Sequence, residues 1–373
     1  MQKKILFIVT EDWYFISHRL KLAKYLIKKG FKVFVCCKDT GNIKDIEENG
    51  MIHFNLSIDR KSLSFIQFLK ESFCITKIVR NIRPDIVHLI SMRPIITGII
   101  STLFVKSNFC ATFTGMGFLF IKKSFKIKVI RKIIIGYLKI FLMFKNLFFI
   151  VQNKDDEAFF KKEFKFKNFF LKVIRGSGID ITYYKYSPEI VKKEVRIAYA
   201  GRILKDKGIL PLIEAFKLAK KKYVNLSLYI AGSLDKKNPS SIPLEHFEKL
   251  IDFEGIFYLG NIKNIRKFWQ KANIAILMSK REGLPLSLLE AAATGRAIIS
   301  TNVTGSREIA IDKYNAINVE EGNVQECSAA ILKLTKNKML RKKYGKNSRK
   351  LVEGEMALEH ICYQYYKLYK EMI

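Results

Sequence analysis

The stretch Glu282-Gly-Leu-Pro-Leu-Ser-Leu-Leu-Glu290 places two carboxylates eight residues apart, with a proline and four leucines between them. It lies between two apolar runs, 274–278 and 297–300, and this order predicts strand, loop, helix and strand. Pro285 suits a first helical turn, because its missing N–H group costs nothing there. Gly295 suits the left-handed residue just beyond a helix end. The stretch therefore predicts an α/β unit with one carboxylate in the loop and the other on the helix.

The start of this helix is a candidate anion site. Ligands of an open α/β sheet bind at the edge where the strands end, and Glu282 belongs to that edge. The N–H groups from about Leu284 to Ser287 would face the same crevice without partners inside the helix. Such a helix start favours negative charge.

A second loop also follows an apolar run. Gly201-Arg-Ile-Leu-Lys-Asp-Lys-Gly208 comes directly after 195–200. Arg202 and Lys207 are five residues apart behind a strand, so both side chains can reach one anion. A solvated basic turn is the competing interpretation.

Together these segments resemble the E-x7-E signature and the G-R-x4-K-G phosphate loop of retaining, nucleotide-sugar-dependent glycosyltransferases of family 4. The segment 300–308 resembles the family's stretch downstream of the signature, and 175–180 resembles its G-x-D element at the domain junction. The motifs follow the family's order and span most of the chain. The resemblance implies an α/β fold of the GT-B type, with two Rossmann-like, doubly wound parallel-sheet domains facing an interdomain cleft.

The resemblance also implies roles for residues. Arg202 and Lys207 would neutralise the departing diphosphate, and Glu282 would face the donor sugar or the charge that develops at its anomeric carbon. Glu290 would accept hydrogen bonds from the ribose hydroxyls, although a surface position on the helix is the alternative. The catalytic set is then Glu282, Arg202 and Lys207. The donor-binding set is Gly201, Arg202, Lys207, Glu282, Gly283, Leu284, Pro285, Leu286, Ser287 and Glu290. No D-x-D motif stands beside a strand end, so we expect neither a metal nor a cofactor.

The first loop, Thr10–Ala23, lacks the glycine-rich turn of many family members and resembles the form found in bacterial polysaccharide and lipid-linked glycan transferases. Trp13, Tyr14 and Phe15 would lie near the acceptor sugar or prenyl chain. Arg19 would meet the acceptor phosphate. A core or capping role for His18 stays open. The full acceptor-binding set is Trp13, Tyr14, His18, Arg19, Arg93, Thr114, Gly115 and Gly117.

One departure from the family affects the mechanism. Many members carry a histidine after the fourth strand, where this chain has Thr114. A hydroxyl cannot replace an imidazole as an acid or base near neutral pH, so we assign no general base. The resemblance implies that the acceptor hydroxyl attacks on the face from which the diphosphate leaves, and that the leaving oxygen takes the proton.

The formal charge of +33, from 67 basic and 34 acidic residues, is concentrated in one window. Residues 86–154 contain no Asp or Glu, and 119–150 interleaves lysines with aromatic and aliphatic side chains. The lysines interrupt any transmembrane span, which needs ~20 mostly uncharged residues. We expect this segment to lie on an anionic membrane surface. The residues expected there are Lys122, Lys123, Lys126, Lys128, Arg131 and Lys132.

Other accounts of the charge remain. A buried helix with snorkelling lysines would give the same pattern, and an AT-rich genome would raise the lysine content throughout. Nucleic acid is the competing partner for so basic a chain. The sequence has no helix-turn-helix, zinc-finger or RNP-like signature, so we expect no specific nucleic-acid binding.

Apolar runs alternate with helix-like segments along the chain, which predicts parallel sheets with helices on both faces. A helix is expected at Pro94–Phe104. Strands are expected at 5–9, 32–37, 85–90, 109–113 and 147–152, and then near 195–200, 226–231, 256–259, 274–278, 297–301 and 316–318.

The length of 373 residues exceeds the ~100–200 of one domain, so we expect two. Residues 1–180 would form the acceptor-binding, membrane-facing domain and 190–355 the nucleotide-sugar-binding domain, and 356–373 would form a helix that crosses back to the first. No secretory signal is recognised, and the six cysteines form no C-x-x-C pair. We expect a cytoplasmic protein that associates peripherally with the inner face of the cytoplasmic membrane.

The expected function is transfer of a hexose or N-acetylhexosamine from a UDP-sugar, with retention of configuration, to a lipid-linked (polyprenyl-diphosphate) or polysaccharide acceptor in bacterial cell-surface glycan biosynthesis. Uracil preference is an expectation from the family alone. Two alternatives are a UDP-sugar 2-epimerase on the same fold and a non-catalytic membrane-associated scaffold.

Overall fold

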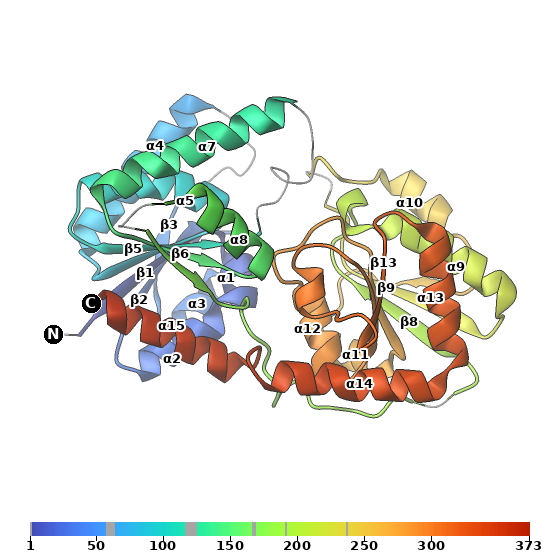
Figure 1. Ribbon diagram of the computed structural model, residues 1–373. Coiled ribbons are helices and arrows are strands. Elements are labelled where there is room, and N and C mark those ends of the chain that lie inside the picture. The colour runs from blue at the N-terminus through green and yellow to red at the C-terminus, as the bar shows by residue number, and fades with distance from the viewer. Residues whose placement is uncertain (1, 57–63, 116–124, 166–168, 191, 236–237) are drawn as a thin grey trace. The chain divides into compact units, whose positions relative to one another are not determined.

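The computed structural model describes residues 2–56, 64–115, 125–165, 169–190, 192–235 and 238–373. The chain divides into two compact units (Figure 1). Unit 1 comprises Met1–Ser177 together with Ile361–Ile373, and unit 2 comprises Gly178–His360. Each unit is built around its own parallel sheet.

Unit 1 contains a seven-stranded sheet in the order β3-β2-β1-β4-β5-β6-β7, in which every neighbouring pair is parallel. β1 and β4 are buried over nearly their whole length because helices cover both faces. The strands are β1 (Lys4–Glu11), β2 (Lys32–Lys38), β3 (Ile52–Asn55), β4 (Ile86–Ile90), β5 (Asn108–Phe113), β6 (Leu147–Val151) and β7 (Phe169–Val173).

The helices of unit 1 include two long ones with apolar outer faces, α4 (Phe65–Ile82) and α7 (Phe125–Phe144). Figure 1 shows them on the same flank of the sheet, and the rings of Phe68 and Tyr137 meet with centroids 6.4 Å apart. The others are α1 (Asp12–His18), α2 (Leu20–Lys28), α3 (Ile43–Glu47), α5 (Met92–Gly98), the 3₁₀ helix η1 (Ile99–Leu103) and α8 (Lys154–Glu163).

The C-terminal helix α15 (Leu358–Met372) packs against this sheet through aromatic side chains. The Tyr369 hydroxyl lies 2.7 Å from Nδ1 of His88, a residue of β4. The Arg19 guanidinium lies over the Tyr365 ring, 5.3 Å from its centroid. Burial lowers the pKa of His88 well below its usual value, so this histidine is neutral at pH 7.

Unit 2 contains a six-stranded parallel sheet in the order β10-β9-β8-β11-β12-β13. Its strands are β8 (Val195–Ala200), β9 (Leu226–Ala231), β10 (Ile256–Tyr258), β11 (Ile274–Leu277), β12 (Ala297–Thr301) and β13 (Ala316–Val319). Its helices are η2 (Lys205–Lys207), α9 (Ile209–Lys222), α10 (Leu244–Ile251), α11 (Ile265–Lys271), α12 (Leu286–Ala293), η3 (Ser306–Glu308), α13 (Val324–Lys336) and α14 (Lys338–Glu353).

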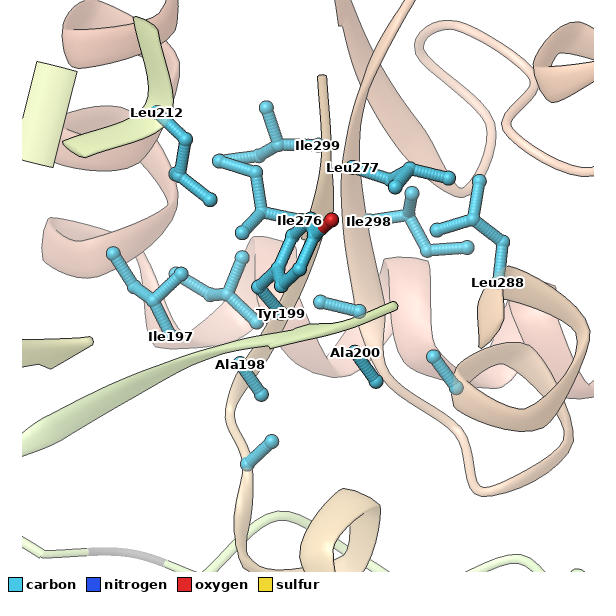
Figure 2. Close-up of a cluster of buried hydrophobic side chains, with 14 of the residues drawn as sticks. Ile197, Ala198, Tyr199, Ala200, Leu212, Ile276, Leu277, Leu288, Ile298 and Ile299 are labelled. Atoms are coloured by element: carbon cyan, nitrogen blue, oxygen red, sulfur yellow. The ribbon is translucent and has the colours of Figure 1, made fainter. Parts of the chain in front are cut away.

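Central strands supply the core of unit 2. In Figure 2 the ring of Tyr199 lies among aliphatic side chains from β8, α9, β11, α12 and β12. Its hydroxyl donates a hydrogen bond to the carbonyl of Arg202, 2.8 Å away. Because that hydroxyl is the polar tip of a buried ring, this bond ties the loop after β8 to the core.

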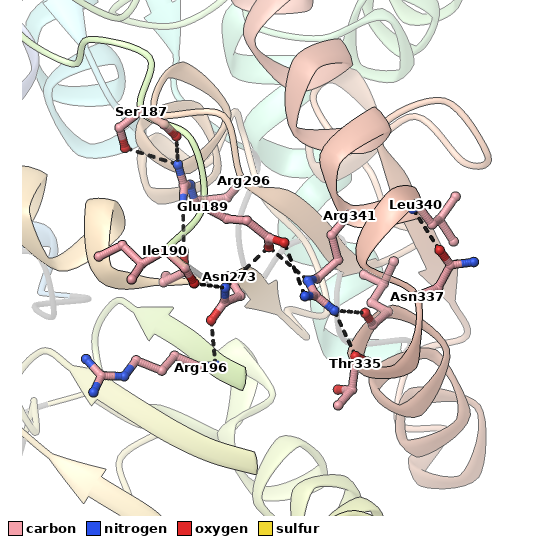
Figure 3. Close-up of polar contacts among 12 residues, drawn as sticks. Ser187, Glu189, Ile190, Arg196, Asn273, Arg296, Thr335, Asn337, Leu340 and Arg341 are labelled. Atoms are coloured by element: carbon pink, nitrogen blue, oxygen red, sulfur yellow. Dashed lines mark hydrogen bonds and ion pairs between the residues drawn. The ribbon is translucent and has the colours of Figure 1, made fainter. Parts of the chain in front are cut away.

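A buried polar network fastens the segment before β8 to the rest of unit 2 (Figure 3). Glu189 accepts two hydrogen bonds from Arg341 of α14, at 2.9 and 3.1 Å, and one from Asn273 at 3.3 Å. Arg296 donates to the carbonyls of Ser187 and Ala272. Burial lowers the pKa of Arg296 to about 10, although nearby Glu189 opposes the shift.

The predicted doubly wound α/β architecture and the predicted strands are confirmed. Gly295 has φ of +81°, as its position beyond a helix end predicted. Two details differ. Pro285 is the residue that caps α12 rather than part of its first turn, and the helix expected at Pro94–Phe104 begins at Met92 and tightens into η1 after Gly98. The prediction also missed the sheet-edge strands β3 and β7, whose residues are mostly half-exposed and so lack the continuous apolar pattern of central strands.

Candidate active site

The loop after β8 carries the first predicted motif. The N–H group of Gly201 donates to the carbonyl of Ala231, which ends β9. Gly208 has φ of +69°, and a Cβ atom there would lie 1.8 Å from the carbonyl oxygen of Met278. Glycine is therefore required at position 208, because the loop passes directly against the chain that follows β11.

Lys207 and Glu282 meet although 75 residues separate them. The Lys207 ammonium nitrogen lies 2.5 Å from Oε1 of Glu282, and the Ser279 hydroxyl donates to the same oxygen at 2.6 Å. Burial raises the pKa of Tyr199, and the nearby Glu282 charge raises it further. The ends of β8 and β11 thus bring a cation and an anion together.

Arg202 takes a different partner. Its Nη1 atom lies 3.1 Å from Oδ2 of Asp235, which follows β9, and both side chains are partly exposed. Asp235 was not among the predicted residues, because no motif marks it. The pair places a second cation at the edge where these strands end.

The turn before η3 packs directly against the loop between β11 and α12. The Glu282 N–H group donates to the carbonyl of Thr304, 3.0 Å away. Gly305 has φ of +80°, and a Cβ atom there would lie 2.5 Å from the carbonyl oxygen of Glu282. Leu284 and Leu286 pack their side chains against the core, so Gly283 to Ser287 offer mainly backbone groups to a ligand. The first N–H groups of α12 begin at Leu286 and have no partner within the helix.

Glu290 is nearly enclosed, with 8% of its surface exposed. The Tyr184 hydroxyl donates to its Oε1 atom at 2.7 Å, and the indole Nε1–H of Trp269 donates to its Oε2 atom at 3.0 Å. A surface position, the alternative raised for Glu290, is excluded by this burial. Its predicted contact with ribose hydroxyls stays a prediction.

In unit 1, Trp13 and Tyr14 at the end of β1 are partly exposed, whereas Phe15, which was predicted to lie with them near the acceptor, is fully buried. Trp13 is 41% exposed, and its ring contacts that of Tyr14, with centroids 6.1 Å apart. The Tyr14 ring in turn packs edge-on against His18, 4.6 Å away. Burial and the neighbouring Arg19 charge lower the pKa of His18 to about 4, so its imidazole is neutral at pH 7.

Arg19 does not lie where an acceptor contact would need it. Its side chain is only 1% exposed, and Nη1 donates to the Tyr365 hydroxyl at 3.2 Å. An acceptor phosphate has no access to a guanidinium in this position. The structure therefore favours a structural role for Arg19, which holds α15, over the predicted acceptor contact.

The ends of β4 and β5 hold the remaining predicted residues that the structure describes. The Arg93 Nε atom lies 2.8 Å from Oε2 of buried Glu71, an ion pair that joins α5 to α4. The Thr114 and Ser91 hydroxyls are 3.2 Å apart, and Gly115 has φ of +122°. Ser91 has φ of +76°, a strained conformation for serine, and it was not predicted.

Four of the predicted residues cannot be placed fully. Gly117, Lys122 and Lys123 lie outside the described residues, and Lys126 is described only by its helical backbone in α7. Lys128 and Lys132 are exposed on α7, and Arg131 is half-exposed.

Sequence reasoning also missed the acid that organises the β1 loop. Asp12 is fully buried and accepts hydrogen bonds from the N–H groups of Thr40 and Asn42, at 2.7 and 3.0 Å, and from the Thr40 hydroxyl. Burial alone would raise the pKa of Asp12, but these hydrogen bonds lower it overall. No spacing rule reveals this role, because the partners follow another strand.

A cavity of about 360 Å³ lies in unit 2 beside α11. Basic and aromatic side chains line it together with the chain that follows β10. The lining residues are Arg196, Ala198, Tyr229, Leu259, Ile262, Asn264, Lys267, Phe268, Lys271 and Ala272. None of the predicted donor-binding residues lines it.

Among the described residues, no group of three or more His, Cys, Asp or Glu side chains is arranged to hold a metal ion. Within the same part of the chain, no helix combines the length and apolar character that crossing a membrane requires.

The site can be compared with known proteins. Residues 4–152 match the family model described as "Glycosyl transferase 4-like", and residues 181–351 match "Glycosyl transferases group 1". The chain belongs to this family of glycosyltransferases. The resemblance carried by the two motifs is thereby confirmed.

Several relatives align with this glycosyltransferase over most of its length. It is 25% identical to the N,N'-diacetylbacillosaminyl-diphospho-undecaprenol alpha-1,3-N-acetylgalactosaminyltransferase of Campylobacter jejuni, over 96% of this chain and 98% of the relative. It is 23% identical to the UDP-Gal:alpha-D-GlcNAc-diphosphoundecaprenol alpha-1,3-galactosyltransferase of Escherichia coli, over 90% and 89%. The crystal structure of Anabaena HepE with UDP and glucose superposes with a TM-score of 0.80 at 15% identity, covering 99% of both chains, which shows the shared GT-B fold.

Proposed function

We propose that this glycosyltransferase moves a hexose or N-acetylhexosamine from a UDP-sugar to a polyprenyl-diphosphate-linked or polysaccharide acceptor, with retention of anomeric configuration and without a metal ion. The observation that carries the proposal is the meeting of Lys207 and Glu282 beside the start of α12. The names of the Campylobacter and Escherichia relatives, which act on undecaprenyl-diphosphate-linked sugars, support the acceptor class.

The donor diphosphate would be received by two cations that each contact a carboxylate in the structure. Lys207 forms an ion pair with Glu282, and Arg202 forms one with Asp235. A diphosphate offers both cations a stronger, doubly charged partner. When Lys207 turns to the phosphate, the Glu282 carboxylate becomes available to the hydroxyls of the donor sugar. The N–H groups at the start of α12 would add to the same anion site.

The chemical step would need no enzymic base. The acceptor hydroxyl attacks the anomeric carbon on the face from which the diphosphate leaves, and the bond from that carbon to the diphosphate oxygen breaks. The departing oxygen takes the hydroxyl proton. Arg202 and Lys207 stabilise the negative charge that develops on the diphosphate. Thr114, whose hydroxyl lies 3.2 Å from Ser91, would position substrate rather than transfer a proton.

The acceptor would approach unit 1, where Trp13 and Tyr14 present exposed or half-exposed rings at the end of β1. Aromatic rings bind the apolar faces of sugars and isoprenoid chains. The Trp N–H and Tyr O–H groups can meanwhile stay in contact with water. Thr114 and Gly115 at the end of β5 would contact the same substrate.

The membrane would be met by an apolar surface of unit 1, formed by α4, α7 and the end of η1. Exposed side chains on these helices are Phe65, Ile66, Leu69, Phe73, Leu103, Phe104, Phe125, Val129, Ile133, Ile140, Met143 and Phe144. Lys128 and Lys132 lie among them. α7 has no acidic residue, and the single acid of α4, Glu71, is buried against Arg93.

This composition fits an anionic leaflet. The apolar side chains would enter the acyl boundary while the lysines meet headgroups. Each lysine near such a surface contributes about 1 kcal/mol of attraction. Peripheral association at the inner face of the cytoplasmic membrane follows from this proposal, because a polyprenyl-linked acceptor is held in the membrane.

Donor and acceptor are tested by release of UDP from a panel of UDP-sugars in the presence of EDTA, with and without polyprenyl-diphosphate-sugar extract. We expect release from one donor, and only with the extract. Release without the extract, together with free sugar, would instead support the epimerase. Binding of UDP-sugars without any release under all conditions would support the scaffold.

The membrane surface is tested by sedimentation of the full-length protein with vesicles of phosphatidylglycerol or phosphatidylcholine. Phe73→Asp is expected to lower the bound fraction on phosphatidylglycerol several-fold, because an ionised side chain disfavours the acyl boundary. The matched control is Met339→Asp on α14, since Met339 is 73% exposed and Phe73 is 72% exposed. Equal binding of both variants would refute the surface.

A further inference from the structure

Two neutral donors hold the carboxylate of Glu290 from opposite elements. The Trp269 indole of α11 donates to Oε2, and the Tyr184 hydroxyl, from the segment before β8, donates to Oε1. Each carboxylate oxygen thus receives one directional hydrogen bond from a buried side chain. Neither donor belongs to a motif that the sequence analysis singled out.

Both donors are themselves fixed. Trp269 is 1% exposed and packs against Phe268, with ring centroids 5.2 Å apart. The carbonyl of Tyr184 accepts a hydrogen bond from Nη1 of Arg349 at 2.6 Å, and the same nitrogen donates to Ala293, the last residue of α12, at 2.8 Å. Glu290 is therefore held by α11 and by the segment before β8, and Arg349 of α14 ties that segment to the end of α12.

The chemistry of the two donors preserves the acceptor capacity of Glu290. Burial raises the pKa of Tyr184 first, and the Glu290 charge raises it further, so its hydroxyl stays a proton donor at neutral pH. An indole N–H group is a donor only. A carboxylate offers roughly four acceptor positions, more than a singly bonded hydroxyl does. A fixed carboxylate of this kind suits a vicinal diol, because the two hydroxyls need acceptors at a set separation.

We propose that Tyr184 and Trp269 are positioning residues that hold the Glu290 carboxylate in the orientation that receives the ribose hydroxyls of the nucleotide. This inference rests on the proposed function and on the predicted contact of Glu290 with the ribose hydroxyls. It adds that the affinity for the nucleotide depends on two residues that do not touch it. Preorganisation of this kind lowers the cost of ordering a polar contact when the ligand binds.

The test is calorimetric binding of UDP and of 2′,3′-dideoxy-UDP to the full-length protein. Trp269→Phe and Tyr184→Phe each remove one hydrogen bond with little change in shape. Each is expected to weaken UDP binding about tenfold, which corresponds to ~1.4 kcal/mol. Binding of dideoxy-UDP, which lacks the two hydroxyls, should change by less than about twofold. A merely structural role would weaken both ligands equally, and that result would overturn the inference.

Tyr137→Phe provides the matched control. Tyr137 of unit 1 also loses one hydroxyl hydrogen bond on this substitution, to the carbonyl of Ile96 at 2.7 Å. UDP binding should then be unchanged. Circular dichroism and thermal unfolding show whether each variant keeps its fold, and the comparison of the two nucleotides is made within each variant, so a moderate loss of stability does not hide the outcome.

Glu290→Gln separates failure of this inference from failure of the proposed site. If Glu290→Gln weakens UDP binding while both positioning variants bind as the wild type, the inference fails and the ribose contact stands. If Glu290→Gln also binds UDP as the wild type, the ribose contact itself fails.

Tryptophan emission gives an independent readout, because the chain has only two tryptophans. UDP should change the emission of the Trp13→Phe variant, in which Trp269 is the remaining indole. Trp269→Phe should lose most of the response. No response in Trp13→Phe would contradict a nucleotide beside Glu290.

Discussion

The two units differ in how their predicted residues are arranged. In unit 2, residues from distant motifs meet in direct contacts, such as Lys207 with Glu282 and Ser279. In unit 1, the predicted acceptor residues separate, with Trp13 half-exposed and Arg19 in the interior. The difference teaches that the fold itself brings the motif side chains of unit 2 into contact, whereas unit 1 presents surface aromatics and apolar helices, which the proposed acceptor and membrane would use.

The buried ion pair of unit 2 gives the largest expected effect. Arg341→Met should lower the free energy of unfolding of unit 2 by about 3–5 kcal/mol, because it leaves the Glu189 charge buried without its partner. Hydrogen exchange of the amides of unit 2, compared with those of unit 1, measures this. Lys3→Met removes an exposed ion pair with Asp85 in unit 1 and should cost no more than about 1 kcal/mol. Equal losses of unfolding free energy in the two variants would contradict the expected difference between the buried ion pair of unit 2 and the exposed ion pair of unit 1.

The donor cations give the next effect. Lys207→Met should lower kcat/KM for transfer about 10²–10³-fold, because one preorganised charge on the departing diphosphate is lost. Steady-state release of UDP at fixed acceptor concentration measures it. Lys221→Met, on an exposed position of α9, is the control and should leave the rate unchanged. Wild-type activity of the Lys207→Met variant would refute the proposed contact of Lys207 with the diphosphate.

Buried Asp12 gives unit 1 a contribution to stability that depends on pH. The pKa of Asp12 is lowered in the folded protein, so its contribution to stability is fully present above the unfolded pKa of ~3.9 and is lost as pH falls through the folded value. Asp12→Asn should cost about 1–3 kcal/mol at pH 7 and much less at pH values below the folded pKa of Asp12. Urea unfolding followed by the emission of Trp13, which adjoins Asp12, measures both. A cost that does not depend on pH would show that the charge of Asp12 has no role.

Much of the fold could be predicted, because parallel strands buried on both faces give continuous apolar runs. The edge strands β3 and β7 were missed, since their residues are mostly half-exposed and lack that pattern. Glycines with a fixed conformational role, such as Gly295, were predictable from the helix end that precedes them.

In the candidate donor site, the sequence indicated which loops follow strands of one sheet, and their donor-binding role stays a prediction. The pair of Lys207 and Glu282 joins two motifs that both follow strands of one parallel sheet. The partners Asp235, Tyr184 and Trp269 were not predictable, because each is brought in by tertiary packing. The position of Arg19 was predicted from its place at a helix start, but the sequence does not show that α15 covers it.

The central claim is transfer to a lipid-linked acceptor, and mass analysis of the lipid product tests it most directly. The wild-type protein is incubated with the UDP-sugar that the panel selects, with a polyprenyl-diphosphate-linked sugar and with EDTA. The account predicts a lipid product heavier by one sugar residue, formed in equal amount to the UDP released. UDP accompanied by free sugar and an unchanged lipid would contradict it.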